Sequence, residues 1–241
     1  MMAFSKSPKH FIQYRNRKWE STPAMELGTA FHKYFLEGET AFHEAYIVHE
    51  KMDMRRKENK AAMVELVENS NGKSLIDEVG FSTILRMTES VSSDKFAGKL
   101  FGSCNVVEQK LTFKIGGLPF VGYVDAAKRG DDGYWFDLKT TNDASPKAFK
   151  GKFFSMGYNI QHAVYYEALR QNCFDVTMDD AYTVAVETVS PHGVGVYKMS
   201  EARIQAGLDE VNRRVEMFKK CMDTQSWDQG YTFNNGVITI D

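Results

Sequence analysis

The stretch "GYWFDLKTTND" (133–143) places an acid and a lysine inside a run of residues that otherwise favours a buried β-strand. Because side chains alternate between the two faces of a strand, Asp137 and Lys139 point to one face and Leu138 points to the other. Charged groups are costly to remove from water unless a partner neutralises them. Any fold built around this strand therefore has to supply such a partner.

The segments around this strand predict an α/β sandwich built on one mixed sheet. Residues 103–141 alternate polar and apolar side chains, with turn signals at Gly116-Gly117 and at "RGDDG" (129–133), which predicts a three-stranded antiparallel meander. "DDAYTVAVETVSP" and "GVGVYKMS" predict two more strands. The helical pattern between them, "SPKAFKGKFFSMGYNIQHAVYYEALRQ", predicts two helices hinged near Gly157.

The length of 241 residues suits a single domain that spans the whole chain. Residues 1–100 are expected to form a mainly helical layer. Residues 103–199 are expected to form the sheet and the helices within it, and residues 200–241 a C-terminal helix and tail. Within the first layer, "TPAMELGTAFHKYFLEGE" predicts a helix that Thr22 caps and Gly38 ends.

Composition excludes several classes of protein. The formal net charge of −2 gives no global basic field for a polyanionic partner, although a local patch or an oligomer could supply one. The three cysteines are widely spaced and form no Cys-x-x-Cys pair, so a zinc ribbon or a cysteine-ligated cluster lacks its ligands. No segment has the pattern of a signal peptide or a membrane span, so the sequence predicts a soluble, cytoplasmic protein without a membrane partner.

Two further acids are expected to lie near Asp137 on neighbouring strands. Asp125 is expected to end the second strand of the meander, in "VGYVDAAK", and the short hairpin brings it beside Asp137. Glu108, early in the first strand, reaches the same face if that strand bends slightly. Carboxylates gathered in one place suit hard divalent cations, and the backbone carbonyl of Leu138 adds another oxygen.

This set of residue types fits the hydrolysis of a phosphate ester. Metal ions held by shared carboxylates can activate a water and stabilise charge at phosphorus, and a lysine beside them can orient or deprotonate that water. The simpler alternative is a surface strand that carries an ion pair between residues two apart. An acid followed by acid-x-lysine does not by itself decide between these alternatives.

The order of motifs along the chain adds to this pattern. Asp125 followed by Asp137-Leu138-Lys139 resembles the motif of the PD-(D/E)XK nuclease superfamily. "GTAFHKYFLE" resembles the helix whose histidine, here His32, binds metal in RecB-like nucleases, and "GYNIQHAVYY" resembles their Gln-x-x-x-Tyr helix. "SKSPKHFIQYRN" and "DLKTTNDASPKAF" are most similar to RecE-type phage and prophage exonucleases, and the likeness extends from about Ser5 to Gln171.

The resemblance implies a PD-(D/E)XK (restriction-endonuclease-like) core, a mixed central sheet flanked by helices, although Val124 stands where the motif has proline. It implies Mg²⁺ as cofactor, with Mn²⁺ as a substitute, and no iron–sulfur cluster. Metal ligation is expected of five groups: His32, Glu108, Asp125, Asp137 and the Leu138 carbonyl. Catalysis is expected of Lys139 together with Asp125, Asp137 and Glu108. DNA contacts are expected of Thr140, Lys147, Lys150, Gln161 and Tyr165.

The function implied by the resemblance is Mg²⁺-dependent digestion of linear duplex DNA from its 5′ ends, which leaves 3′ single-stranded tails. Members of the RecE type form ring-shaped homo-oligomers, so a trimer or tetramer in the cytoplasm of a bacterial host is expected, with a RecT-type annealing protein as partner. The alternatives are a structure- or sequence-specific endonuclease of the same fold and a non-catalytic DNA-binding module.

Overall fold

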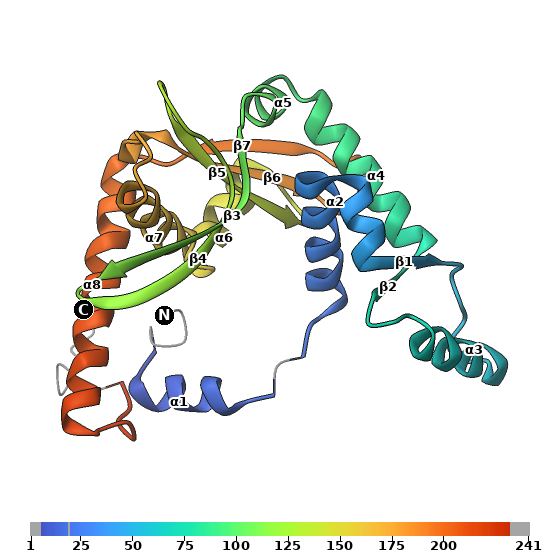
Figure 1. Cartoon of the computed structure of the whole chain (residues 1–241), viewed down its shortest axis with the longest axis horizontal. Helices are drawn as coiled ribbons and strands as arrows, with labels where there is room; N and C mark the ends of the chain where they lie inside the picture. The colour runs from blue at the N-terminus through green and yellow to red at the C-terminus, as the bar shows by residue number, and fades with distance from the viewer. Residues whose placement is uncertain (1–5, 19, 232–241) are drawn as a thin grey trace.

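The computed structural model describes residues 6–18 and 20–231 of the chain, and Figure 1 shows how its helices and strands are arranged. The helices are α1 (Pro8–Asn16), α2 (Pro23–Ala45), α3 (Lys57–Glu68), α4 (Glu78–Ser93), α5 (Lys95–Gly102), α6 (Pro146–Ser155), α7 (Tyr158–Gln171), the short 3₁₀ helix η2 (Met178–Asp180) and α8 (Glu201–Thr224). The strands are β1 (Tyr46–His49), β2 (Ser74–Asp77), β3 (Val106–Ile115), β4 (Leu118–Lys128), β5 (Tyr134–Thr141), β6 (Ala181–Glu187) and β7 (Val194–Lys198).

The strands form a five-stranded sheet and a two-stranded sheet. The larger sheet has the order β3-β4-β5-β6-β7, in which β5 and β6 are parallel and all other neighbours are antiparallel. Its first three strands are the predicted meander, with turns at the two predicted positions. This mixed sheet flanked by helices confirms the predicted fold class.

Helices cover both faces of the larger sheet. On one face, α6, α7 and α8 enclose a core that includes Trp135 and Leu169. On the other face, α2, α4 and α5 enclose a second core that includes Phe31 and Phe136. Trp135 and Phe136 are adjacent in β5 and enter opposite cores, as the alternation of side chains along a strand requires. Figure 1 shows α7 and α8 on one side of the sheet and α2 and α4 on the other.

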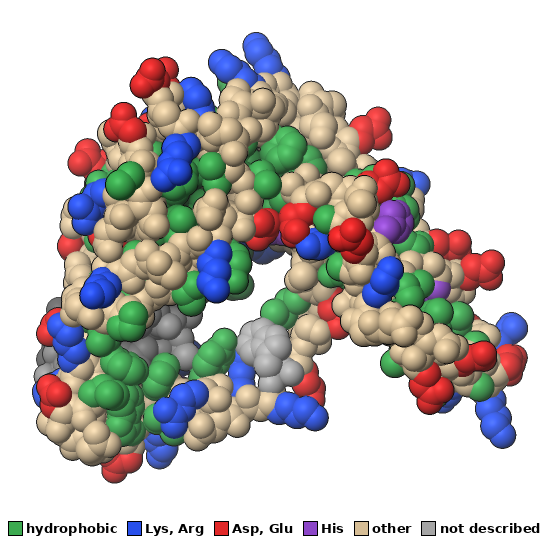
Figure 2. All heavy atoms as spheres, viewed as in Figure 1, with side chains coloured by type: hydrophobic (Ala, Val, Ile, Leu, Met, Phe, Trp, Pro, Cys, Tyr) green, Lys and Arg blue, Asp and Glu red, His purple; other side chains and the backbone are tan. Residues whose placement is uncertain are grey.

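The N-terminal helix α1 packs against the far end of α8, through a small apolar cluster that contains Phe11, Phe218, Cys221 and Trp227. Figure 2 shows a hollow between α1, the β3–β4 pair and α2. In the described residues, no helix has the length and apolar character that crossing a membrane requires. The last ten residues of the predicted C-terminal tail, 232–241, lie outside the described residues.

Two element ends differ from the prediction. Thr22 caps α2 as predicted, since its hydroxyl accepts the Met25 N–H at 3.3 Å, but α2 does not end at Gly38. Gly38 has φ 90° and ψ 169°, a conformation that glycine adopts without a Cβ clash, and the helix resumes beyond it to Ala45. Asp125 does not end β4, which continues to Lys128 because the next three residues pair with β5.

The predicted helical layer also contains a small sheet that the sequence pattern did not indicate. β1 and β2 pair in parallel over four residues each, from Tyr46 opposite Ser74 to His49 opposite Asp77. Strands this short show too few alternations to be recognised against the helical pattern around them.

Side-chain amides at the end of α7 fix this helix to the edge strand β3. Gln171 accepts the Lys114 N–H at 2.9 Å and donates to the Lys114 carbonyl at 2.8 Å, while Asn172 donates to the Thr112 carbonyl at 3.1 Å. These bonds satisfy backbone groups that an edge strand otherwise leaves open to another chain. They also fix the position of α7 along the length of β3.

A buried hydrogen-bonded chain links β5, α7 and β6. The Trp135 indole N–H donates to Nδ1 of His162 at 3.2 Å, and Nε2 of His162 lies 2.7 Å from the Thr183 hydroxyl. Because Nδ1 accepts, the neutral imidazole carries its proton on Nε2 and donates it to Thr183. His162 is fully buried, and this burial lowers its pKa to about 4.

The depressed pKa of His162 predicts a loss of stability in acid. Between pH 6.5 and pH 4 the unfolded chain binds a proton that folded His162 does not, so the free energy of unfolding falls as the pH falls. We expect this residue to contribute about 3 kcal/mol to that fall. Urea unfolding at pH 7 and at pH 4.5 should therefore show a weaker pH dependence for His162→Gln than for the unchanged protein. His43→Gln, at a half-exposed histidine, is the matched control; an equal pH dependence in all three proteins would contradict the assignment.

Candidate metal and phosphodiester site

Strands β4 and β5 separate at the point where each carries an acid. Their ladder ends with Ala126 opposite Phe136, so Asp125 and Asp137 face each other without backbone pairing. The Asp125 carboxylate fills the gap, because its Oδ2 accepts the Leu138 N–H at 2.8 Å. A side chain thus replaces the ladder bond and holds the two strands slightly apart.

The other neighbour of β4 is also distorted beside Asp125. β3 pairs through Val107 with Ala126 and through Gln109 with Val124, and the position between them, Glu108, has φ 45°. A left-handed conformation costs a non-glycine residue about 1–2 kcal/mol, so the fold maintains strain here. The sequence predicted that Glu108 reaches Asp125 through a slight bend, and the structure brings the two together through this single backbone conformation.

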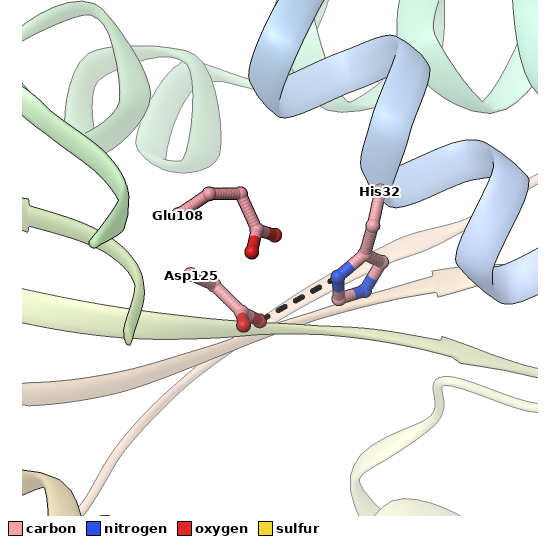
Figure 3. Close-up of side chains that lie close together, drawn as sticks. All are labelled: His32, Glu108 and Asp125. Atoms are coloured by element: carbon pink, nitrogen blue, oxygen red, sulfur yellow. Dashed lines mark ion pairs between the residues drawn. The ribbon is translucent and has the colours of Figure 1, made fainter. Parts of the chain in front are cut away.

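Helix α2 adds a histidine to these two acids. Nδ1 of His32 lies 3.8 Å from Oδ2 of Asp125, and one potential ligand atom from each of His32, Glu108 and Asp125 lies within 4.8 Å of the other two. Figure 3 shows His32 extending from α2 toward Asp125, with the Glu108 carboxylate facing the same space. The structure therefore brings together three of the predicted ligands.

His32 is held in the neutral form that binds a metal. Burial, followed by the nearby charge of Lys139, lowers its pKa to about 4, although Asp137 and a hydrogen bond with the Leu138 backbone act in the opposite direction. For a histidine that hydrogen bond is made to the carbonyl, so the Leu138 carbonyl also faces this site. A neutral imidazole, two carboxylates and a carbonyl form a donor set that suits a divalent cation.

Asp137 and Lys139 form an ion pair directly behind this cluster. Oδ2 of Asp137 lies 2.6 Å from Nζ of Lys139, and the Asp137 side chain is completely buried. Apart from this contact with Lys139, the carboxylate oxygens of Asp137 have no hydrogen-bond partner among the described residues, so Lys139 alone compensates the burial of Asp137. Asp137 is therefore adjacent to the cluster of His32, Glu108 and Asp125 but is not part of it, because its carboxylate is paired with Lys139.

The charges at this site are out of balance. Burial, followed by the charge of Asp137, raises the pKa of Asp125 well above its ordinary value. Burial, followed by the charge of Glu37, also raises the pKa of Glu108. Burial alone would lower the pKa of Lys139, but Asp137 and Asp125 outweigh it and raise that pKa. The single ammonium group of Lys139 interacts with the carboxylates of both Asp137 and Asp125, so it cannot neutralise both charges. A bound divalent cation would supply the missing positive charge.

The cluster opens into a groove of about 990 Å³ between α2, the meander and α7. Figure 2 shows acidic side chains beside a basic one in the hollow between the sheet and α2. Of the residues predicted to contact DNA, Thr140 and Tyr165 line this groove, and Gln161 donates to the Tyr165 hydroxyl at 2.7 Å. The two residues of the predicted Gln-x-x-x-Tyr pair therefore lie one turn apart on α7, and the tyrosine lines the groove.

The two predicted DNA-binding lysines of α6 do not reach the groove. Lys147 and Lys150 are exposed, and neither lines it. On the same helix, Nζ of Lys152 donates to the Thr141 hydroxyl at 2.6 Å, and Thr141 is a groove residue. Helical spacing turns Lys152 toward the strand and the other two toward solvent, which a count of nearby lysines in the sequence cannot distinguish.

Sequence reasoning also missed Tyr158 at the first turn of α7. Its ring centroid lies 5.1 Å from Nζ of Lys139, and its side chain lines the groove. The aromatic face therefore adds a cation–π contact to the ammonium group that Asp137 also neutralises. The available signal was the spacing, since Tyr158 and Gln161 are three residues apart and share a face of the helix.

Comparison with known proteins places this geometry in context. The sequence model of a family described as "PDDEXK-like domain of unknown function" matches residues 1–230. A crystal structure from Eubacterium rectale, described as a "putative exonuclease", superposes with a TM-score of 0.53 at 14% identity, covering 88% of this chain and 73% of that chain. That likeness supports the fold. The structure of SSO0001 covers 82% of this chain and 87% of its own at 15% identity, but its TM-score of 0.31 is too low to support an argument. No curated protein matches the chain.

Replacing Asp125 by asparagine tests the charge imbalance directly. In EDTA we expect Asp125→Asn to raise the melting temperature by about 2–4 °C, the change that 1 kcal/mol gives in a domain of this size, because a buried like charge is removed. The asparagine carbonyl can still accept the Leu138 N–H. Adding Mg²⁺ should raise the melting temperature of the unchanged protein and not that of the variant.

Asp131→Asn, at an exposed acid of the β4–β5 turn, is the control and should behave as the unchanged protein in both conditions. An Asp125→Asn protein that is less stable in EDTA and still responds to Mg²⁺ would show that Asp125 neither carries excess charge nor binds the ion.

Proposed function

The chain belongs to this family of PDDEXK-like domains, and from that premise we propose that it is a divalent-metal-dependent nuclease that hydrolyses phosphodiester bonds in DNA. The observation that carries the proposal is the meeting of four elements, β3, β4, β5 and α2, at one groove. The parted strands supply Asp125, Asp137 and Lys139, the strained position of β3 supplies Glu108, and α2 supplies His32.

The residues present fit a divalent cation. His32, Glu108 and Asp125 would hold it, with the Leu138 carbonyl as a further donor, and Asp137 would join them if Lys139 released it. We propose Mg²⁺ as the natural ion and Mn²⁺ as a substitute, because hard oxygen donors predominate. When bound, such an ion polarises a phosphate and lowers the pKa of a coordinated water.

Lys139 is the group of this chain that would act on the nucleophilic water or on the developing negative charge. Asp137 at 2.6 Å and the Tyr158 ring fix the position of its ammonium, and its raised pKa keeps it charged before substrate binds. A charged lysine can donate hydrogen bonds to a phosphate oxygen or orient a water. Around Lys139, the Gln161–Tyr165 pair of α7 and Thr140 of β5 would contact the DNA backbone.

Within this activity we propose digestion of linear duplex DNA from 5′ ends, which leaves 3′ single-stranded tails. The resemblance of the motifs to RecE-type exonucleases supports this choice, and the exonuclease description of the Eubacterium rectale neighbour agrees with it. A ring-shaped trimer or tetramer, a RecT-type annealing partner and a place in the bacterial cytoplasm belong to the same proposal. An oligomer would also supply the basic surface that a chain of net charge −2 lacks.

An endonuclease of the same fold is the second candidate, because the groove of about 990 Å³ is open to solvent. A non-catalytic DNA-binding module is disfavoured. Such a module does not need a fully buried carboxylate at Asp137, which Lys139 alone compensates among the described residues, or the strained backbone at Glu108.

The role of Lys139 is tested by substitution. We expect Lys139→Ala to lower Mg²⁺-dependent degradation of linear duplex DNA at least about 100-fold, since a positioned proton-transfer or charge-stabilising group contributes about that much. Lys60→Ala, at an exposed lysine of α3, should retain full activity. Thermal melts must accompany the assay, because Lys139→Ala also leaves Asp137 buried without its partner. A folded Lys139→Ala protein with normal activity would remove the basis of the proposal.

Polarity and end dependence need a separate measurement. A linear duplex labelled at its 5′ end should release the label as mononucleotides early, whereas a 3′ label should remain on long single strands. A closed circle of the same sequence should stay intact. Cleavage of the circle would instead establish the endonuclease, and early release of the 3′ label would reverse the proposed polarity.

A further inference from the structure

A second aromatic and basic surface lies away from the acidic cluster, on four neighbouring strands. Lys128 of β4 pairs directly with Tyr134 of β5, and Tyr182 of β6 pairs directly with Lys198 of β7. The rings of Tyr134 and Tyr182 meet edge to face, with centroids 6.1 Å apart. The four side chains therefore form one row, lysine–tyrosine–tyrosine–lysine, across the same face of the sheet.

Helix α5 forms the opposite wall and makes this surface a groove. The groove has a volume of about 490 Å³, and α5 lines it with Phe96, Lys99 and Leu100. Phe96 is 65% exposed, far more than a phenylalanine that serves the core. Figure 1 shows α5 beside β7, and Figure 2 shows basic side chains gathered on the edge of the molecule over α5. We call this surface the α5 groove.

The lysines of the α5 groove are not committed to ion pairs. Within the described ranges, Lys99 and Lys128, which line the groove, form no salt bridge. Lys198 does not line the groove but forms no salt bridge either, and its Nζ lies over the ring of the groove residue Tyr182 at 5.9 Å. The groove also contains two acids, Asp132 at its rim and Asp180. Asp180 is already occupied, because its Oδ2 accepts the Thr177 N–H and hydroxyl, both at 2.7 Å. The groove thus presents more free positive than negative charge.

The α5 groove is distinct from the site around Asp125. Tyr134 and Asp137 lie three residues apart in β5, so their side chains point to opposite faces of the strand. The two pockets share no lining residue. A ligand in the α5 groove would therefore not contact the acidic cluster.

We propose that the α5 groove binds single-stranded nucleic acid. The exposed ring of Phe96, the half-buried rings of Tyr134 and Tyr182 and the unpaired lysines fit a polymer in which bases stack on the rings while phosphates contact the ammonium groups. A duplex fits less well, because its bases are already stacked on one another and cannot turn to Phe96 and Tyr182. An acidic polypeptide would use the lysines but would gain little from the exposed phenyl ring. The proposal goes beyond the nuclease activity and does not depend on a bound metal.

Binding of a fluorescent oligothymidylate, measured by anisotropy in EDTA so that no cleavage occurs, tests the proposal. We expect Phe96→Ala to weaken binding at least about fivefold, the lower end of what loss of one stacked base produces. Phe154→Ala, at another exposed phenylalanine on α6, is the matched control and should bind normally.

Salt dependence tests the lysines separately. Replacing Lys99, Lys128 and Lys198 together by alanine should reduce the slope of log affinity against log salt by about 2, since each phosphate contact on a single strand contributes about 0.7. A triple alanine variant of Lys51, Lys57 and Lys60, which are exposed in and before α3, should leave the slope unchanged.

Two results would overturn the proposal. One is unchanged oligothymidylate affinity and slope in both groove variants, with thermal melts showing that they fold. The other is equal displacement of the oligothymidylate by polyglutamate together with normal binding by Phe96→Ala, which would make the groove a site for acidic polypeptides. Because the binding assay contains no metal, neither result depends on cleavage of a duplex in Mg²⁺. The nuclease proposal is therefore tested independently of this one.

Discussion

The bond from the Leu138 N–H to the Asp125 carboxylate is the interaction on which the site depends. It replaces a rung of the sheet, so β4 and β5 part where their acids face each other. The gap keeps Asp125 accessible from the groove and leaves Asp137 enclosed behind it. It also turns the Leu138 carbonyl toward His32, so that one residue's backbone contacts both α2 and β4. A regular ladder would have placed the same residues on a closed sheet with no room for a ligand.

Around that gap the charged groups divide into a fixed pair and an unbalanced set. Asp137 and Lys139 neutralise each other in a buried environment, and this pairing fixes the position of the Lys139 ammonium. Asp125 and Glu108 have raised pKa values because of burial and neighbouring acids, while His32 has a lowered one. All three pKa shifts indicate that the site lowers the stability of the protein when no cation is bound. Groups with such unfavourable electrostatics are common at functional sites, where a bound ligand compensates them.

The sequence predicted those features that depend on local pattern. The meander, its two turns, the shared face of Asp137 and Lys139 and the hinge at Gly157 all follow from alternation and turn chemistry. Features that depend on neighbouring elements were not accessible in the same way. The left-handed backbone of Glu108 follows from its place opposite Asp125, and the continuation of α2 past Gly38 follows from the packing of Phe42 in the core. The meeting of His32 with Glu108 and Asp125 joins residues that are distant in the sequence, and only the resemblance to a known family suggested it.

The chain Trp135–His162–Thr183 has a consequence for experiments on this protein. Trp135 is fully buried two residues before Asp137 on the same face of β5, and its indole N–H is bound to an imidazole. The electronic transitions of an indole respond to nearby charge and to its hydrogen-bond partner. Trp135 is therefore an intrinsic fluorophore placed directly behind the acids, and its emission can report changes at the groove without any attached label.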